Sequence, residues 1–344
     1  MEWYEVNKRD LPWRNTRNPY FIWLSEIILQ QTRIDQGLDY YFRITGKYPN
    51  VRALANAKEA DVLRIWQGLG YYSRARNLHA TAKRIVKEFN GKFPEDYPSL
   101  RSLKGVGDYT AAAIMSFAFE KSYAVVDGNV YRLLSRYLGI DAPIDTGHGK
   151  KTFQTVADEL ILGHSPFIYN QAIMEFGARQ CKPVDPNCTV CPLNQSCIAF
   201  KKNIVHLLPV KSGKTKIRKR YFNYLVIIHK NSFYLRKRTG KDIWNGLHDF
   251  PLIETTQPVS ENRLMKSAEW KNTFRNNRIE IIGVSEERKH ILSHQHIHAR
   301  FFQVFAESAN WHFPDDWKRV TRKSVKKYAI PRLIEKYLEE NIGL

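Results

Sequence analysis

Apolar side chains recur at helical spacing through the first 200 residues, and short polar or glycine-containing segments separate these runs. From Tyr20 to Gln31, directly after Pro19, apolar residues return every three or four positions, which predicts a helix with a buried face. Asn56 and Glu59 have the spacing of a capping box for a helix over residues 62–66. The same periodicity predicts helices at residues 34–42, 73–89, 109–119, 130–138, 151–162 and 167–179. We therefore expect an all-α unit up to residue 200.

The pattern changes after residue 200, where strand-like runs replace the helical spacing. Six of the ten residues in the segment 211–220 are basic and none follows an apolar period, so we expect a basic linker over residues 201–220. The remainder, residues 221–344, predicts an α+β domain that ends in a helix opened by Pro331. The expected strands are residues 221–229, 233–238, 278–284 and 298–305, the first two joined as a hairpin by Lys230-Asn231-Ser232.

The chain of 344 residues carries 54 Lys and Arg against 34 Asp and Glu, which gives a net charge of +20. Such a surplus is typical of a protein that binds a polyanion or an anionic membrane. The apolar runs at residues 21–29 and 224–228 are too short or too interrupted to cross a bilayer, and residues 1–13 lack the apolar segment of a secretory signal. We therefore expect a cytoplasmic protein that lies in the bacterial cytosol or nucleoid. The polyanion that it binds is expected to be nucleic acid.

All four cysteines lie in one stretch, with six, two and five residues between them. They are Cys181, Cys188, Cys191 and Cys197. A disulfide framework would spread its cysteines along the chain, whereas four thiolates in one loop can surround a single metal centre. Both zinc and a 4Fe-4S cluster accept four cysteine ligands. Because zinc sites usually pair two short knuckles and the first gap here is six residues, the spacing favours the 4Fe-4S cluster over zinc and over four reduced, unliganded cysteines.

A glycine-containing turn, residues 103–110, lies between two predicted helices. Gly105 and Gly107 permit left-handed backbone angles, so that consecutive N–H groups can point outward at the start of the next helix and bind a phosphate. Lys104 lies beside them and is expected to contact the same phosphate. This is the helix-hairpin-helix pattern, and by itself it is equally consistent with a plain interhelical turn.

Several motifs occur in the order typical of one superfamily. Residues 1–200 resemble the endonuclease III superfamily of DNA glycosylases and, within it, the adenine DNA glycosylases of the MutY family. The motifs are LPWR at 11–14, WLSE at 23–26, LQQT at 29–32, GLGYYSRARNL at 68–78, VDGNV at 126–130 and the cysteine loop. The resemblance implies a mainly α catalytic region over residues 1–200, with a six-helix module at 18–117 and an iron–sulfur module at 1–17 and 118–200. It also implies an α+β Nudix-like domain at 221–344.

Two carboxylates are the candidate catalytic pair. Removal of a base requires a proton for the leaving purine and negative charge beside a cationic sugar, and two carboxylates can supply both. Glu26 lies inside an apolar run, where burial should raise its pKa, although an arbitrary helical Glu is more often solvated. Asp127 precedes a helix and is a natural N-cap. The resemblance implies that Glu26 protonates adenine N7 and that Asp127 stabilises the sugar cation or forms a transient adduct, with Asn129 orienting Asp127 or water.

The residue after Gly107-Asp108 indicates the reaction type. Bifunctional relatives carry a lysine there that forms a Schiff base, whereas this chain has Tyr109, so we predict a monofunctional glycosylase that leaves an abasic site. The target base must leave the stack before it can be removed. By resemblance, Gln31 and Tyr71 are expected to wedge into the duplex, and Tyr72, Arg74 and Arg76 are expected to support that loop and contact phosphates. The residues that resemble an adenine pocket are Trp13, Arg14 and Gln171.

The resemblance rests on fewer motifs in the C-terminal domain. The stretch WNGLHDFP at 244–251 resembles the Nudix-related domain that reads 8-oxoguanine in this family, and no R-E-x-x-E-E box follows it, so nucleotide diphosphate hydrolysis is not expected. The recognition turn would be Leu292-Ser293-His294, where the family usually has Phe-Ser-His. Leu292 loses a stacking ring, while Ser293 and His294 can still hydrogen-bond the oxidised base.

These observations combine into one hypothesis, a monomeric DNA repair enzyme with a 4Fe-4S cluster that removes adenine from A:8-oxoguanine or A:G pairs in duplex DNA. One rival is a glycosylase of the same fold that acts on thymine or uracil at mismatches, and the extra Nudix-like domain argues against it. The other rival is a catalytically silent iron–sulfur DNA-binding protein. The retained Glu26 and Asp127 argue against that alternative.

Overall fold

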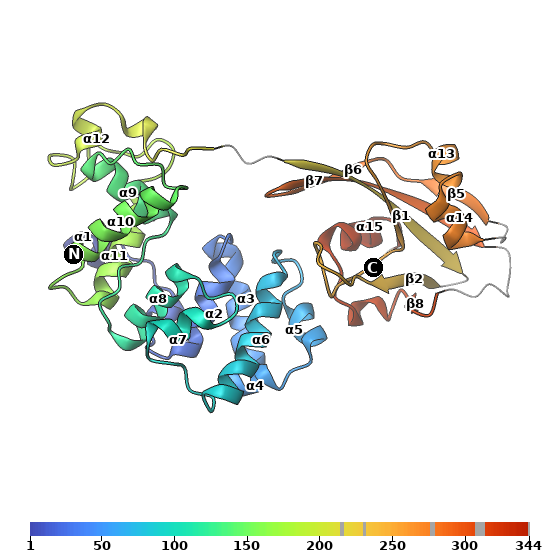
Figure 1. The fold of residues 1–344 in the computed structure, drawn as a ribbon, viewed down its shortest axis with the longest axis horizontal. Helices are drawn as coiled ribbons and strands as arrows, with labels where there is room; N and C mark the ends of the chain where they lie inside the picture. Colours follow the sequence, from blue (N-terminus) through green and yellow to red (C-terminus); the bar gives the residue numbers. More distant parts are fainter. Residues whose placement is uncertain (214–216, 230–231, 276–278, 307–313, 343–344) are drawn as a thin grey trace. The chain divides into compact units, whose positions relative to one another are not determined.

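The computed structural model describes residues 1–213, 217–229, 232–275, 279–306 and 314–342 (Figure 1). The chain divides into two compact units, and each combines segments that are distant in sequence. The first unit is Met1–Asn56 with Asn77–Lys214, and the second is Ala57–Arg76 with Thr215–Leu344. Within the described residues, no helix is long and apolar enough to span a bilayer.

Residues 1–213 form helices and connecting loops, which confirms the predicted all-α region. The elements are α1 (Glu2–Asn7), η1 (Pro12–Arg14), α2 (Pro19–Leu29), α3 (Ile34–Lys47), α4 (Val51–Ala55), α5 (Glu59–Ile65), α6 (Ser73–Glu88), α7 (Tyr97–Ser102), α8 (Asp108–Phe119), α9 (Gly128–Leu138), α10 (Gly147–Leu160), α11 (Pro166–Arg179), α12 (Ile198–Lys201) and η2 (Val205–Leu207). The predicted capping box is wrong. Asn56 is the C-cap of α4, and α5 begins after Lys58 without a side-chain cap. Helices α4 and α7 were not predicted from the periodicity because each is too short to show it.

Two helices form the centre of the first unit. α2 is buried on nearly every side from Tyr20 to Ile28, and α8 is buried from Thr110 to Phe117. A helix that is apolar all round lies in the interior of a protein. α2 and α8 pack against each other, and α9 packs against α11. This packing places Glu26, on α2, within reach of the first turn of α8 and thereby creates the frame of the candidate site.

The second unit is built on a sheet of eight strands in its described residues, which confirms the α+β prediction. Strand β1 is central and runs parallel to β7 and antiparallel to β2 and β4. The strands are β1 (Arg218–His229), β2 (Ser232–Lys237), β3 (His248–Asp249), β4 (Leu252–Thr255), β5 (Ile279–Val284), β6 (Arg288–Leu292), β7 (Gln295–Ala306) and β8 (Trp317–Thr321). The helices are α13 (Glu261–Met265), α14 (Ala268–Phe274), η3 (Val325–Lys327) and α15 (Arg332–Ile342).

The two faces of this sheet have different cores, because side chains alternate along a strand. On one face Leu225 packs with Trp270 and Phe274 of α14. On the other, Phe301 stacks on Tyr337 of α15 at a centroid distance of 3.9 Å. The sheet is therefore covered by helices on both sides (Figure 1).

Two sequence expectations about this unit need comment. β1 begins at Arg218, so the last three residues of the predicted linker are strand residues, and Arg220 is buried. The predicted hairpin is present, since Ile228 pairs with Phe233, while its turn residues 230–231 lie outside the described residues. The strands β4, β6 and β8 and the helices α13 and α14 were not predicted.

The contact between α11 and the start of α9 leads to a testable prediction. A Cβ atom on Gly177 would lie 2.7 Å from the backbone oxygen of Asn129. We expect Gly177→Ala to lower the free energy of unfolding by about 1–3 kcal/mol, because neither backbone can give way cheaply. Gly147→Ala is the matched control, since a Cβ there meets nothing within 4 Å. Urea unfolding of both variants checks this, and equal stability of the two would contradict it.

Candidate active site

Eight of the predicted site residues line one cavity of about 500 Å³ in the first unit. They are Trp13, Arg14, Glu26, Gln31, Tyr109, Asp127, Asn129 and Gln171. They come from η1, α2, the residues after α2, α8, the start of α9 and α11. Six predicted residues do not line this cavity, namely Tyr71, Lys104, Gly105, Gly107, Ser293 and His294.

Glu26 is the buried carboxyl group of this cavity. It lies on α2 among apolar residues, and only 7% of its surface is exposed. Burial raises the pKa of Glu26 from 4.5 to about 7, although a hydrogen bond from Tyr109 opposes the shift. The charge of Asp127 adds to the increase. The carboxyl group of Glu26 therefore holds a proton near neutral pH, as the apolar run in the sequence predicts.

Asp127 caps α9 and has a different environment. Its Oδ1 accepts hydrogen bonds from the backbone N–H groups of Asn129 and Val130, at 2.9 and 2.8 Å. Its Oδ2 accepts one from the Asn129 amide at 2.7 Å, and Arg132 in turn donates to Asn129 Oδ1 at 2.8 Å. Burial raises the pKa of Asp127 above its ordinary value, and the hydrogen bonds from these donors and the charge of Arg132 oppose that rise. Three N–H donors at a helix N-terminus favour the ionised form of the carboxyl group.

Tyr109 lies in the first turn of α8 and lines the cavity with the two carboxyl groups. Its hydroxyl donates to Glu26. Burial raises the pKa of Tyr109 well above 10, and the charges of Glu26 and Asp127 raise it further. The hydroxyl thus remains protonated and serves as a hydrogen-bond donor at neutral pH.

An ion cluster in the wall of the cavity, formed by Arg9, Arg14 and Glu175, was not predicted from the sequence. Glu175 on α11 is fully buried and accepts hydrogen bonds from the Nε and NH2 groups of Arg9 at 2.7 and 2.6 Å. Arg14 NH2 donates to the same carboxylate at 2.7 Å. Burial acts to raise the pKa of Glu175, yet the hydrogen bonds from both arginines outweigh it and lower the pKa to about 2. Gln171 accepts a 3.0 Å hydrogen bond from the Tyr4 hydroxyl.

The helix-hairpin-helix turn lies between α7 and α8. Lys104 is exposed, and Gly105 has a φ of +83°, a value that favours glycine. A Cβ atom on Gly105 would lie 2.9 Å from Asn77, so both backbone angle and space require glycine there. The expectation for Gly107 is wrong, because its φ of −89° is not left-handed. Gly107 is the N-cap of α8, with open space where a side chain would lie.

The loop before α6 presents one aromatic residue to solvent. Tyr71 has a φ of +48° and is 46% exposed, and Tyr72 is buried with its hydroxyl accepting from the Gly68 backbone N–H. Arg74 does not fit the predicted phosphate contact. It is buried, its guanidinium lies over the Trp66 ring, and it donates to the Gly70 carbonyl at 3.2 Å. Arg74 therefore supports the loop, which was the other part of its predicted role.

The predicted 8-oxoguanine turn is a two-residue connection between β6 and β7. Ser293 and His294 form the turn and are exposed, and Leu292 before them is half-buried. The Ser293 hydroxyl lies in hydrogen-bond contact with the Tyr71 hydroxyl, and both belong to the second unit. Two residues expected to recognise DNA, from segments 222 positions apart, are thus neighbours.

The four cysteines line one small cavity of about 30 Å³ and form no disulfide. Arg136 NH1 lies 3.5 Å from the sulfur of Cys181, and the same group donates to the Lys182 carbonyl at 2.7 Å. A cationic side chain at a sulfur suits a thiolate. Among the described residues, no group of three or more His, Cys, Asp or Glu side chains is arranged to hold a metal ion.

Comparison with known proteins assigns both parts of the chain. Residues 24–157 match the HhH-GPD superfamily of base excision DNA repair proteins, and residues 223–340 match the NUDIX domain. The chain is 32% identical to the adenine DNA glycosylase of Buchnera aphidicola subsp. Schizaphis graminum, over 98% of this chain and 96% of that protein. It is 41% identical to the adenine DNA glycosylase of Mus musculus, over 76% of this chain and 52% of that protein.

Solved structures agree on the fold of the helical region. A thermostable thymine-DNA glycosylase is similar with a TM-score of 0.55 and 29% identity, over 58% of this chain and 93% of that one. Endonuclease III in a trapped covalent intermediate with DNA gives a TM-score of 0.52 and 23% identity, over 59% of this chain and 92% of that one.

The match to the HhH-GPD superfamily and the similarity to curated DNA glycosylases define a base-excision DNA glycosylase whose partner is DNA. Within this class, the full-length similarity shows that the chain belongs to the adenine DNA glycosylases.

The raised pKa of Glu26 predicts how stability depends on pH. Glu26 has a pKa near 4.5 in the unfolded chain and about 7 in the folded chain. Its contribution to the free energy of unfolding is therefore fully present below pH 4.5 and is lost as the pH rises through 7. We expect Glu26→Gln to be about 3 kcal/mol more stable than wild type at pH 8 and similar to it at pH 4. Exposed Glu95→Gln is the control and should show no such difference. Thermal unfolding of the variants and wild type at both pH values tests this prediction. Identical unfolding curves for Glu26→Gln and wild type at pH 8 would refute it.

Proposed function

We propose that this enzyme is a monofunctional adenine DNA glycosylase that removes adenine opposite 8-oxoguanine or guanine in duplex DNA and leaves an abasic site. The observation that carries the proposal is the cavity in which a proton-bearing Glu26 lies beside an Asp127 held by three N–H donors. A protonated carboxyl group beside a second carboxyl group that accepts several hydrogen bonds is the arrangement that acid-assisted glycosidic cleavage requires.

The proposed reaction begins with proton transfer from Glu26 to N7 of the extruded adenine. The bond between C1′ and N9 then breaks, and its electron pair leaves with the base. The ionised Asp127 lies beside the sugar and stabilises its positive charge. Water adds to C1′ and returns a proton to Glu26, so the enzyme is regenerated and the products are adenine and an abasic sugar.

Tyr109 supports the monofunctional assignment. A lysine at this position could attack C1′ as an amine and cut the strand through a Schiff base. The phenol of Tyr109 keeps its proton, because burial raises its pKa well above 10, and it is already bonded to Glu26. Its role in the proposal is to orient the Glu26 carboxyl group.

Recognition of the DNA is assigned to residues outside the cavity. Gln31, with a φ of +56° just beyond α2, and the exposed Tyr71 are the proposed wedge residues. Ser293 and His294 are proposed to contact the oxidised guanine, and the contact of Ser293 with Tyr71 supports a joint role. Lys104 and the backbone of the helix-hairpin-helix turn would bind phosphate without reading sequence. The enzyme is proposed to act as a monomer, in the cytosol of a bacterial host.

The cysteine loop is proposed to hold a 4Fe-4S cluster. The fit rests on four undisulfided cysteines around one cavity, with Arg136 beside Cys181. Bound there, the cluster would cross-link residues 181–197 and hold the loop after α11 in place. The cysteines take no part in the proposed glycosidic step.

A single-turnover assay tests the proposed function. Duplexes with A:8-oxoguanine, A:C, T:G or U:G are incubated with excess enzyme and then treated with alkali to cut abasic sites. We expect cleavage at A:8-oxoguanine only after alkali, and its loss in Glu26→Gln. Absence of cleavage there, or full activity of Glu26→Gln, would refute the function. Selective cleavage at T:G or U:G would favour the rival glycosylase, and strand breaks without alkali would contradict the role of Tyr109.

Metal analysis tests the cluster. We expect the purified protein to contain iron and acid-labile sulfide, and Cys188→Ala to lose most of both while α2 and α8 stay folded. Ser196→Ala is the control within the same loop, because the Ser196 hydroxyl donates a local hydrogen bond to the Leu193 carbonyl. Zinc without sulfide in the wild-type protein would contradict the assignment.

A further inference from the structure

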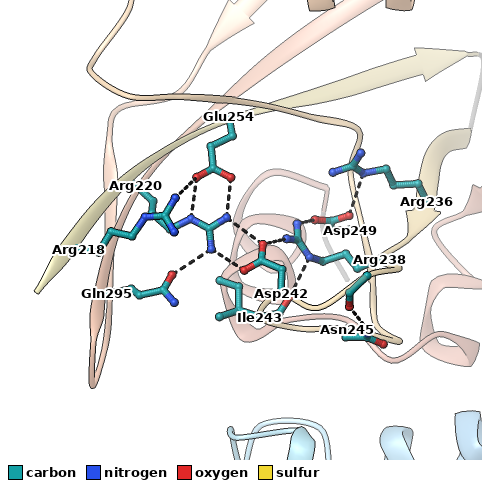
Figure 2. A network of polar contacts seen from close by, with 11 residues as sticks. Arg218, Arg220, Arg236, Arg238, Asp242, Ile243, Asn245, Asp249, Glu254 and Gln295 are labelled. Carbon is teal, nitrogen blue, oxygen red and sulfur yellow. Dashed lines mark hydrogen bonds and ion pairs between the residues drawn. The ribbon is translucent and has the colours of Figure 1, made fainter.

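A buried arginine lies beneath the proposed recognition turn. Arg220 is on β1 and is 4% exposed. Its Nε and NH2 groups donate to Glu254 at 2.7 and 2.5 Å, and its NH1 and NH2 groups each donate to Asp242 at 2.8 Å (Figure 2). These four bonds fix the guanidinium in one orientation between two carboxylates.

The fifth N–H of Arg220 points at the base of the turn. An arginine has five N–H donors, and the one that the carboxylates leave over donates from NH1 to Gln295 Oε1 at 3.0 Å (Figure 2). Gln295 is the first residue of β7 and pairs with Leu292 across the turn. The backbone N–H of Arg218 also donates to the His294 carbonyl at 3.0 Å. The start of β1 thus holds both the backbone and the side chain next to the exposed pair.

The carboxylate partners are themselves anchored. Arg238 NH2 donates to Asp242 at 2.8 Å, and Arg238 NH1 donates to the fully buried Asp249 at 2.7 Å. The hydrogen bond from Arg220 lowers the pKa of Asp242 to about 2, although burial opposes it, so this carboxylate is ionised at physiological pH. The guanidinium of Arg220 is therefore held in a fixed position by its carboxylate partners, and its hydrogen bond to Gln295 restrains the turn.

We propose that Arg220 is a positioning residue for 8-oxoguanine discrimination, acting through Gln295 to fix the turn that carries Ser293 and His294. This inference rests on the proposed function, because it assigns a support to the same recognition turn. Gln295 joins the Tyr71 hydroxyl and the Arg218 backbone N–H in holding this turn, and a small displacement of the Ser293 hydroxyl group would weaken a specific hydrogen bond to a base.

Replacing Gln295 tests the inference without leaving a buried charge unpaired, because Arg220 retains both carboxylates. Gln295→Met keeps the length of the side chain and removes the acceptor, whereas Gln295→Glu keeps an acceptor. The control is Gln303→Met on the same strand, which removes a 3.1 Å hydrogen bond to Tyr337 away from the turn. For each variant, second-order single-turnover rate constants are measured with A:8-oxoguanine and A:G duplexes at enzyme concentrations below saturation.

We expect Gln295→Met to lower the preference for A:8-oxoguanine over A:G by about tenfold, or about 1.4 kcal/mol. The rate constant of Gln295→Met at A:G and its melting temperature should stay at their wild-type values. The preference for A:8-oxoguanine should also stay at its wild-type value in Gln295→Glu and in Gln303→Met. The inference would be overturned by an unchanged preference in Gln295→Met, by an equal loss of rate at both duplexes, or by an equal loss of preference in Gln303→Met. None of these results would overturn the proposed function. A wild-type enzyme that removes adenine without any preference would overturn the recognition part of the proposed function as well.

Discussion

The active site depends on one constraint, the desolvation of a single carboxyl group. Glu26 lies on α2, a helix that is buried on nearly every side and packs against α8. In water this group would lose its proton below neutral pH, whereas in this interior its pKa rises to about 7. The packing of the two helices therefore supplies the proposed acid. Glu26 lowers the stability of the folded chain at alkaline pH, and its proposed role as proton donor explains why a glutamate stands there.

The second carboxyl group shows that burial alone does not decide the charge state. Asp127 shares the cavity with Glu26, but it caps α9 and accepts three hydrogen bonds from N–H groups. Glu175, fully buried nearby, is an extreme case, because two arginines lower its pKa to about 2. Three carboxyl groups in one region thus meet different surroundings: burial raises the pKa of Glu26 to about 7, three N–H donors oppose the rise that burial causes at Asp127, and two arginines lower the pKa of Glu175 to about 2.

The parts of this account that are local in sequence could be predicted. The apolar run around Glu26 and the N-cap position of Asp127 are set by neighbouring residues, and so are the long helices. Contacts between distant segments could not be predicted in this way. Glu175 meets Arg9 across 166 positions, and Arg220 was counted as linker charge although strand pairing buries it. Arg74 was predicted to contact a phosphate, yet it is buried. The sequence shows the charge of a side chain but does not show whether that side chain points into the fold.

The most direct test of this account is a titration of the Glu26 carboxyl group itself. Infrared difference spectra, wild type minus Glu26→Gln, isolate the protonated carboxyl band of this residue between pH 4 and pH 9. The account predicts that the band persists at pH 6 and disappears with a midpoint near pH 7. A midpoint near 4.5, the ordinary value for glutamate, would show that Glu26 is ionised at neutral pH and would contradict its role as the proton donor.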